Sequence, residues 1–338
     1  MRYPYYPSLC LVFLFFGTCQ DNPTNGGKPP CGGIDPGIGP QPPYDNPIWH
    51  PSGQFIGFNH IPLKRITYPY GEQCWGEQEF IPDSTGFWLI NADGTKMRRI
   101  FPYKLLCPVW SPDGEWVAFV SGAQILKMRF TGTTFDTTSL TQLTTEGRNF
   151  LPAWSPDGEW IAYDNTTCGN ALEPAPPNSC GLLVVRNNGT DRRFLVRGRM
   201  PHWAPDGMHL AYIGLWSEIY RVSVSDTSEV VRLTSFNQID PYARDNRYPR
   251  YSPDGGKIGF RSIDANLWII NSDGTDLKKL TTEREVFGGP FSWSPDGTKI
   301  VYTVFRSNNW GYENGTLWTL NPATGEKRQL TFNLKPSN

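Results

Sequence analysis

The sequence is poor in the residues that most catalytic and metal sites require. It has only four histidines in 338 residues, at His50, His60, His202 and His209. No two cysteines stand in a CxxC spacing, and no Gly-x-Ser-x-Gly segment occurs. This absence argues against a structural zinc site and against the nucleophile elbow of α/β-hydrolases. We therefore expect no catalytic residue, no metal ligand and no cofactor.

The sequence also lacks an excess of charge of either sign. It carries 31 lysines and arginines against 32 aspartates and glutamates, for a net charge of −1. A protein that binds nucleic acid usually presents a strongly basic face. The balance predicts that nucleic acid is not a partner.

The first 19 residues are typical of an export signal and not of a folded segment. Arg2 precedes a short apolar run from Leu9 to Phe16, which is too short to span a membrane. The segment that ends at Cys19, Phe-Gly-Thr-Cys, resembles a bacterial lipobox, although Phe16 and Thr18 replace the usual residues. We expect export and lipidation of Cys19, which would make a lipid anchor the protein's only membrane contact. Plain cleavage nearby, leaving a soluble secreted protein, is the alternative.

Residues 20–45 are rich in glycine and proline and have too few apolar residues to order themselves. They are predicted to be a flexible tether. Two disulfides are expected in an exported protein. Cys168 and Cys180 flank one loop, and Cys74 and Cys107 form the second candidate pair. Five reduced thiols, including Cys31, are the alternative.

A five-residue motif, Trp-Ser-Pro-Asp-Gly, recurs six times with small variations. The copies begin at Trp49, Trp110, Trp154, Trp203, Tyr251 and Trp293. Copies spaced by about 40–50 residues are typical of a propeller or a solenoid. The first copy is degenerate and reads Trp-His-Pro-Ser-Gly.

Each repeat contains four short apolar segments separated by turn signals. Pro-Asp-Gly follows the first segment, and an Asn-x-Asp-Gly type of turn precedes the last, which often ends in Leu-Thr. Such turns between aromatic and β-branched runs predict antiparallel hairpins. The sequence therefore predicts an all-β, six-bladed β-propeller of four-stranded antiparallel blades over residues 46–332, with a C-terminal tail at 333–338. Two ways of closing the ring stay open. Blade six is complete in itself, or the segment before Trp49 adds a strand to it.

The repeated motif followed by a β-strand resembles the TolB-like, or PD40, family of propeller repeats. The resemblance covers roughly residues 46–332. It implies a propeller that binds other proteins of the cell envelope, although the same repeat also occurs in peptidase and lyase propellers. Members named TolB pair the propeller with an N-terminal α/β domain and bind a peptidoglycan-associated lipoprotein. Only the short tether precedes the first repeat here, so we expect a different envelope partner.

The loops predict which face of the propeller binds. Turns between strands one and two and between strands three and four are short and uniform, whereas the other loops are long and irregular, at 59–86, 165–181, 236–248, 283–290 and 304–315. Variable loops on a rigid scaffold often carry function. Aromatic residues and arginines dominate protein-binding surfaces. The candidate residues on this face are Tyr68, Tyr70, Trp75, Arg148, Arg199, Trp216, Arg247, Arg284, Trp310 and Tyr312.

Three functions are compatible with these observations. The favoured prediction is a non-catalytic protein-binding scaffold of the cell envelope, either a monomer or a component of a complex. A carbohydrate-binding or lyase-like propeller is the second, because aromatic rings stack on sugars. A surface-layer or sensor component is the third. Histidines or carboxylates clustered at the channel mouth would favour catalysis, whereas aromatic rings and arginines without such a cluster would favour binding.

Overall fold

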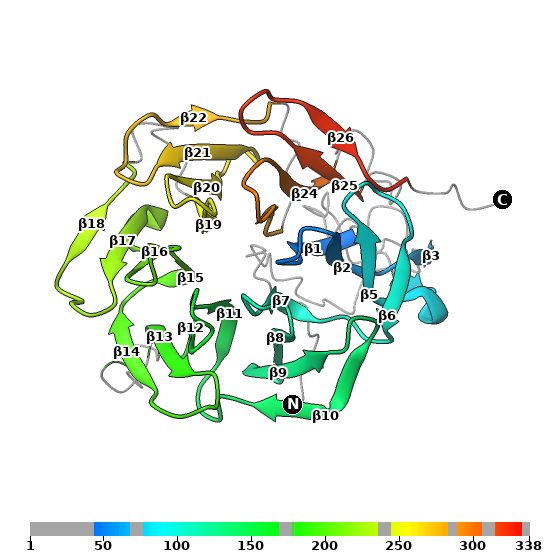
Figure 1. Cartoon of the computed structure of the whole chain (residues 1–338), viewed down its shortest axis with the longest axis horizontal. Helices are drawn as coiled ribbons and strands as arrows, with labels where there is room; N and C mark the ends of the chain where they lie inside the picture. Colours follow the sequence, from blue (N-terminus) through cyan, green and yellow to red (C-terminus); the bar gives the residue numbers. More distant parts are fainter. Residues whose placement is uncertain are drawn as a thin grey trace, which may run out of the picture.

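The computed structural model describes residues 44–67, 77–168, 178, 180–235, 245–282, 289–305 and 315–332, with side chains except at 63–67, 77–79 and 305. The strands in these ranges form six four-stranded sheets and one separate hairpin. Figure 1 shows the six sheets arranged as blades around a central axis. Neighbouring strands pair antiparallel within each blade. The predicted six-bladed β-propeller is therefore confirmed.

Each blade takes its four strands in chain order, with the first nearest the axis. Blade one contains β1 (Tyr44–Trp49), β2 (Phe55–His60), β5 (Gly86–Asn91) and β6 (Arg98–Phe101). Blade two contains β7 (Leu106–Trp110), β8 (Trp116–Ser121), β9 (Gln124–Phe130) and β10 (Phe135–Gln142). Blade three contains β11 (Asn149–Trp154), β12 (Trp160–Asn165), β13 (Gly181–Arg186) and β14 (Arg193–Val196).

The second half of the ring repeats this order with shorter outer strands. Blade four contains β15 (Arg199–Trp203), β16 (His209–Ile213), β17 (Ile219–Ser223) and β18 (Val230–Arg232). Blade five contains β19 (Arg247–Tyr251), β20 (Lys257–Arg261), β21 (Leu267–Asn271) and β22 (Lys278–Lys279). Blade six contains β23 (Ser292–Trp293), β24 (Ile300–Phe305), β25 (Gly315–Leu320) and β26 (Lys327–Gln329).

Three further elements lie between the second and third strands of a blade. The loop of blade one holds the hairpin of β3 (Leu63–Thr67) and β4 (Glu77–Phe80), followed by the 3-10 helix η1 (Pro82–Ser84). The loop of blade four holds η2 (Leu215–Ser217). The same connection in blade two is only a tight turn between Ser121 and Gln124. The connection between the second and third strands therefore differs in length from blade to blade.

The repeated motif closes the turn between the first and second strands of a blade. In blade three, Ser155 Oγ accepts a hydrogen bond from the backbone N–H of Trp160 at 2.8 Å. The Asp157 carboxylate accepts from the Ser155 hydroxyl and from the N–H of Glu159. Equivalent bonds recur in blades two, five and six. The motif aspartates thus cap their own turns.

His50 replaces the motif serine in blade one. Its Nδ1 lies 2.9 Å from Ser52 Oγ, and its Nε2 lies 3.2 Å from the carbonyl oxygen of Gly114 in blade two. The ring also packs edge-on against Trp110. The degenerate first motif therefore replaces a turn cap with a contact between two blades.

The Leu-Thr ending of the outer strand also has a structural cause. Thr144 Oγ1 accepts a hydrogen bond from the N–H of Ile125 at 2.9 Å, which joins the fourth strand to the start of the third. Thr234, Thr281 and Thr331 make the same bond in blades four, five and six. The threonine therefore pairs a backbone N–H that the ladder leaves open.

The ring closes without a shared strand, because blade six is complete in its own four strands and β1 belongs to blade one. Figure 1 shows β1 and β2 beside β24 and β25. The N–H of Trp49 donates to Ser292 Oγ at 3.0 Å, and Thr303 Oγ1 donates to the carbonyl oxygen of Tyr44. A buried cluster crosses this junction; its members are Tyr44, Trp49, Ile56, Phe58, Ile90, Val301, Leu317 and Leu330. Of the two closures left open by the sequence, the first is correct.

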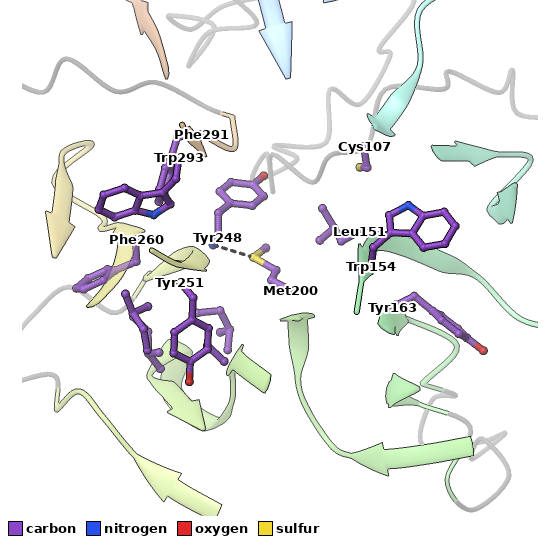
Figure 2. Close-up of a cluster of buried hydrophobic side chains, with 14 of the residues drawn as sticks. Cys107, Leu151, Trp154, Tyr163, Met200, Tyr248, Tyr251, Phe260, Phe291 and Trp293 are labelled. Carbon is purple, nitrogen blue, oxygen red and sulfur yellow. Dashed lines mark hydrogen bonds between the residues drawn. The ribbon is translucent and has the colours of Figure 1, made fainter. Parts of the chain in front are cut away.

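The first strands of blades one to five share a β-bulge near the end at which they begin. The bulged residue has a positive φ of 50° to 57° and directly precedes a proline; these residues are Asn46, Cys107, Leu151, Met200 and Tyr248. The strand pairing shifts at the same points. A bulge re-aims a side chain. All five side chains are buried, and Figure 2 shows four of them around the central axis, with Tyr248 joined to Met200.

Candidate functional site

The two faces of the disc are defined by strand direction. We call the face where first strands begin and second strands end the irregular face. The opposite face carries the motif turns and is called the turn face. Six of the ten candidate binding residues lie outside the described residues: Tyr68, Tyr70, Trp75, Arg284, Trp310 and Tyr312. Arg148, Arg199, Trp216 and Arg247 are described, and all four lie on the irregular face.

Two of these four residues line one cavity between blades four and five. The cavity has a volume of about 220 Å³, and its lining residues are Arg199, Met200, Ile213, Ser217, Asp245, Asn246 and Arg247. The two arginines come from the starts of β15 and β19, so neighbouring blades contribute one each. We call this space the blade 4–5 cavity.

Arg199 faces a buried carboxylate from the neighbouring blade. Its Nε lies 3.5 Å from Oδ2 of Asp164, whose side chain is 1% exposed at the end of β12. Burial raises the pKa of Asp164 to about 6, although the guanidinium of Arg199 opposes the shift. Neither carboxylate oxygen has a hydrogen-bond partner of good geometry in the described structure. The desolvation of this pair thus exceeds the benefit of its contact.

Arg247 is paired more closely. Its Nε donates to Oδ1 of Asp245 at 2.7 Å. Burial lowers the pKa of nearby Arg261, and the positive charge of Arg247 lowers it further. The hydroxyl of Tyr248 is buried without a described hydrogen-bond partner, and burial raises its pKa. Several buried polar groups therefore meet at this point of the axis.

The loop beside the cavity presents apolar side chains to solvent. Leu215 is 75% exposed and Trp216 is 66% exposed, both within η2. Trp216 and Ser217 have positive φ angles of 61° and 58°. A left-handed conformation is costly for residues other than glycine, and such strain is common where function requires it.

Arg148 lies apart from the cavity. Its backbone N–H donates to Thr167 Oγ1 at 2.9 Å, and its side chain is exposed. The nearby Glu146 pairs with Arg192 at 3.0 Å. Of the candidate arginines, Arg247 pairs with Asp245 and Arg199 faces Asp164.

The four histidines have structural surroundings, two of them in blade one and two in blade four. His209 Nδ1 lies 2.8 Å from Asp206 on the turn face, and His60 stacks on Tyr44. His202 Nδ1 accepts the backbone N–H of Tyr251 at 3.2 Å, and burial holds its pKa well below the ordinary value. His202 therefore stays neutral and connects blades four and five. Among the described residues no group of three metal-binding side chains occurs.

The three cysteines in the described part of the chain are disulfide-bonded. Cys168 and Cys180 are bonded, with their Cα atoms 4.8 Å apart, across the second loop of blade three. Cys107 is also disulfide-bonded. Cys74 lies outside the described residues, as do Cys19 and Cys31, so the Cys74–Cys107 pairing stays a prediction.

Sequence reasoning missed Asp164 and Asn246 at the site. Asp164 follows the Ile-Ala-Tyr segment of its second strand, at the position of Asn59 and Thr303 in other blades. Asn59 bonds both the N–H and the carbonyl oxygen of Leu105 in the next blade. The aligned position is apolar in blades two and four, as Val120 and Ile213, so the repeats alone do not identify it as a polar contact between blades.

Comparison with known proteins places the chain among propellers of one kind. No protein-family model matches the sequence. The uncharacterised protein Atu1656 of Agrobacterium fabrum is 26% identical over 230 residues, which cover 65% of this chain and 73% of that protein. The Tol-Pal system protein TolB of a Polaromonas species is 27% identical over 164 residues, covering 46% of this chain and 36% of that protein.

Solved structures agree on the fold. A structure described as a putative TolB from Agrobacterium tumefaciens matches with a TM-score of 0.56 and 21% identity, covering 70% of this chain and 84% of that one. TolB from Acinetobacter baumannii matches with a TM-score of 0.54 and 19% identity, covering 73% and 59%. The fold and the repeats define the class, a six-bladed β-propeller with four-stranded blades. Within that class the chain is TolB-like in sequence and in fold.

The similarity extends to a protein named as a peptidase. The uncharacterised peptidase YuxL of Bacillus subtilis is 34% identical over 112 residues, but these cover only 17% of that protein and 31% of this chain. The relatives of this chain therefore include Tol-Pal system proteins and a protein named as a peptidase. In the described part of the chain, no helix is long and apolar enough to cross a membrane.

Proposed function

We propose that this protein is a non-catalytic scaffold of the bacterial cell envelope that binds a partner protein on its irregular face. One observation carries the proposal. Exposed Leu215 and Trp216 stand beside Ser217, which lines the cavity that also holds Arg199 and Arg247. An exposed aromatic residue next to arginines is the composition typical of protein-binding hot spots.

The comparisons support an envelope partner. Two relatives bear the name Tol-Pal system protein TolB, and the matched segments cover 36% and 39% of them. We extend the assignment to this chain as a proposal. We propose that the partner differs from that of the TolB proteins, because the similarity covers only part of those proteins.

The proposal includes export and lipid anchoring. Residues 1–19 would direct export, Cys19 would carry the lipid, and residues 20–45 would tether the propeller to the membrane; residues 1–43 lie outside the described residues. Metabolic labelling with a lipid precursor tests this. Label that is lost in a Cys19→Ser variant is expected, and an unlabelled wild-type protein would overturn the anchor.

Crosslinking in the native cells tests the scaffold. The tagged full-length protein would be crosslinked, and captured proteins identified by mass spectrometry. We expect one or a few envelope proteins whose capture is lost in a Leu215→Ser, Trp216→Ala double variant. An Asn188→Ala variant on the turn face serves as the control. Equal capture by all three proteins would contradict the face assignment.

A further inference from the structure

The blade 4–5 cavity contains a buried polar side chain without a partner. Asn246 is 7% exposed, lines the cavity and forms no hydrogen bond with any described residue. A primary amide offers two donor hydrogens and one acceptor oxygen. Neither amide atom is among the fully buried polar atoms that lack a partner, so both can pair with water or with a ligand in the cavity. The amide is therefore free to bind a molecule that enters the cavity.

Neighbouring carboxylates largely balance the positive charge of the two arginines in the cavity. Arg199 faces Asp164 at 3.5 Å and Arg247 pairs with Asp245 at 2.7 Å, so each guanidinium has a carboxylate beside it. An anionic ligand would have to compete with these carboxylates. A neutral ligand meets no such competition and can still accept from N–H groups of the Arg199 guanidinium.

The remaining lining residues supply both polar and apolar contacts. Ser217 offers a hydroxyl and Asp245 a second carboxylate oxygen, while Met200 and Ile213 give an apolar wall. Such a mixture of donors, acceptors and apolar surface matches a sugar ring, which carries hydroxyls around its edge and C–H groups on its faces. The volume of about 220 Å³ accommodates one ring.

We propose that the blade 4–5 cavity is a binding site for a single neutral sugar residue, with the Asn246 amide as its central hydrogen-bonding group. The site adjoins the proposed protein contact and shares Arg199 and Arg247 with it, whereas Asn246 belongs to the cavity alone. The cavity is recessed between the starts of β15 and β19, whereas Leu215 and Trp216 project from η2 into solvent.

Titration of the full-length protein with defined sugars tests the proposal. Glucose and N-acetylglucosamine are the neutral probes, and galacturonic acid is the charged one. Saturation-transfer NMR detects contact, and calorimetry gives the dissociation constant. We expect at least one neutral sugar to bind in the millimolar range, with little dependence on salt because no net charge is neutralised.

Two variants test the role of Asn246. Asn246→Ala should weaken the neutral sugar by about tenfold or more, because the amide bonds are lost. Asn246→Asp keeps the volume but removes the donors, and it should weaken binding as well. Asn188→Ala, an exposed turn-face residue, should leave binding unchanged. A thermal unfolding profile for each variant separates lost binding from lost fold.

Three results would overturn the proposal. The first is the absence of binding by either neutral sugar. The second is salt-dependent binding of galacturonic acid alone, which would make the cavity an anion site. The third is unchanged sugar binding in both Asn246 variants while they remain folded. Because Asn246 lies within the cavity, partner capture should persist in its variants, so failure here leaves the scaffold proposal intact.

Discussion

The turn face and the irregular face of this propeller differ in how their carboxylates are paired. On the turn face, the motif serine and aspartate pair with each other and with backbone N–H groups, and the arrangement recurs in four blades. On the irregular face, the carboxylate of Asp164, the Nε of Arg199 and the hydroxyl of Tyr248 are buried without good partners in the described structure. The motif copies also bury unpaired groups, at the indole N–H of Trp110 and Trp154 and the hydroxyl of Tyr251. The two faces therefore differ in their carboxylates: the motif aspartates cap their turns, whereas Asp164 is buried without a good partner.

The largest effect is expected from a glycine of the turn face. Gly114 has φ +75°, and an added Cβ would lie 2.6 Å from the His50 ring. Gly114→Ala should lower the free energy of unfolding by about 2–4 kcal/mol, combining backbone strain with overpacking. Gly53 has φ +72° with no atom within 4 Å, so Gly53→Ala should cost only about 1–2 kcal/mol. Urea unfolding measures both losses. Equal losses would show that the close approach of His50 to Gly114 does not add to the cost.

Substituting the buried Asp164 of the irregular face should stabilise the protein, unlike the glycine substitutions. The folded-state pKa of Asp164 is raised from 3.8 to about 6. The folded protein therefore holds this proton more tightly, and stability falls as the pH rises through that range. Asp164→Asn removes the penalty. Above pH 6 the variant should be more stable than the wild type by about 2 kcal/mol, which is an order-of-magnitude value.

Unfolding measured at several pH values checks this. The advantage of Asp164→Asn should grow as the pH rises from about 4 to about 6 and then stay constant. A variant that is less stable than the wild type at neutral pH would show that the pair with Arg199 is a net stabilising contact.

The motif serines should contribute modest and independent amounts. Ser155→Ala removes the bonds to Trp160 N–H and to Asp157, and should cost about 1 kcal/mol. Ser252→Ala removes the equivalent bonds in blade five and should cost a similar amount. Because blade four separates the two sites, the double variant should lose the sum of the two. A clear departure from additivity in denaturant unfolding would mean that the turns are coupled around the ring.

The smallest effect on stability is expected at η2. Leu215 is 75% exposed and Trp216 is 66% exposed. The Leu215→Ser, Trp216→Ala double variant should change the free energy of unfolding by no more than about 0.5 kcal/mol per site. A large loss would show that these side chains hold the loop together, and would weaken their assignment to a binding surface.

The sequence was sufficient to predict the architecture because the repeated motif determines a local turn. Ser155, Asp157 and Gly158 satisfy one turn among themselves, so the pattern is readable without the rest of the chain. Of the two ring closures left open, the structure shows that blade six is complete in its own strands. That choice depends on the packing of Tyr44 and Trp49 against blade six, at a separation of more than 240 residues.

The candidate site was harder to predict because its contacts, unlike those of the motif turns, join residues that are distant in the sequence. Arg199 and Arg247 were selected by residue type, and the structure brings them to one cavity from two blades. Asp164 and Asn246 were not selected, because an aspartate or asparagine outside a recognisable motif does not by itself indicate a site. Their surroundings come from a neighbouring blade or from a cavity, which only the assembled ring creates.

One measurement tests the division between the two faces most directly. A photoreactive amino acid would be placed at position 216 on the irregular face or at position 188 on the turn face of the full-length protein in its native cells. We expect the photoreactive residue at position 216 to crosslink to a specific envelope protein, and the residue at position 188 to give no such crosslink. A specific crosslink from position 188, with none from position 216, would contradict this expectation.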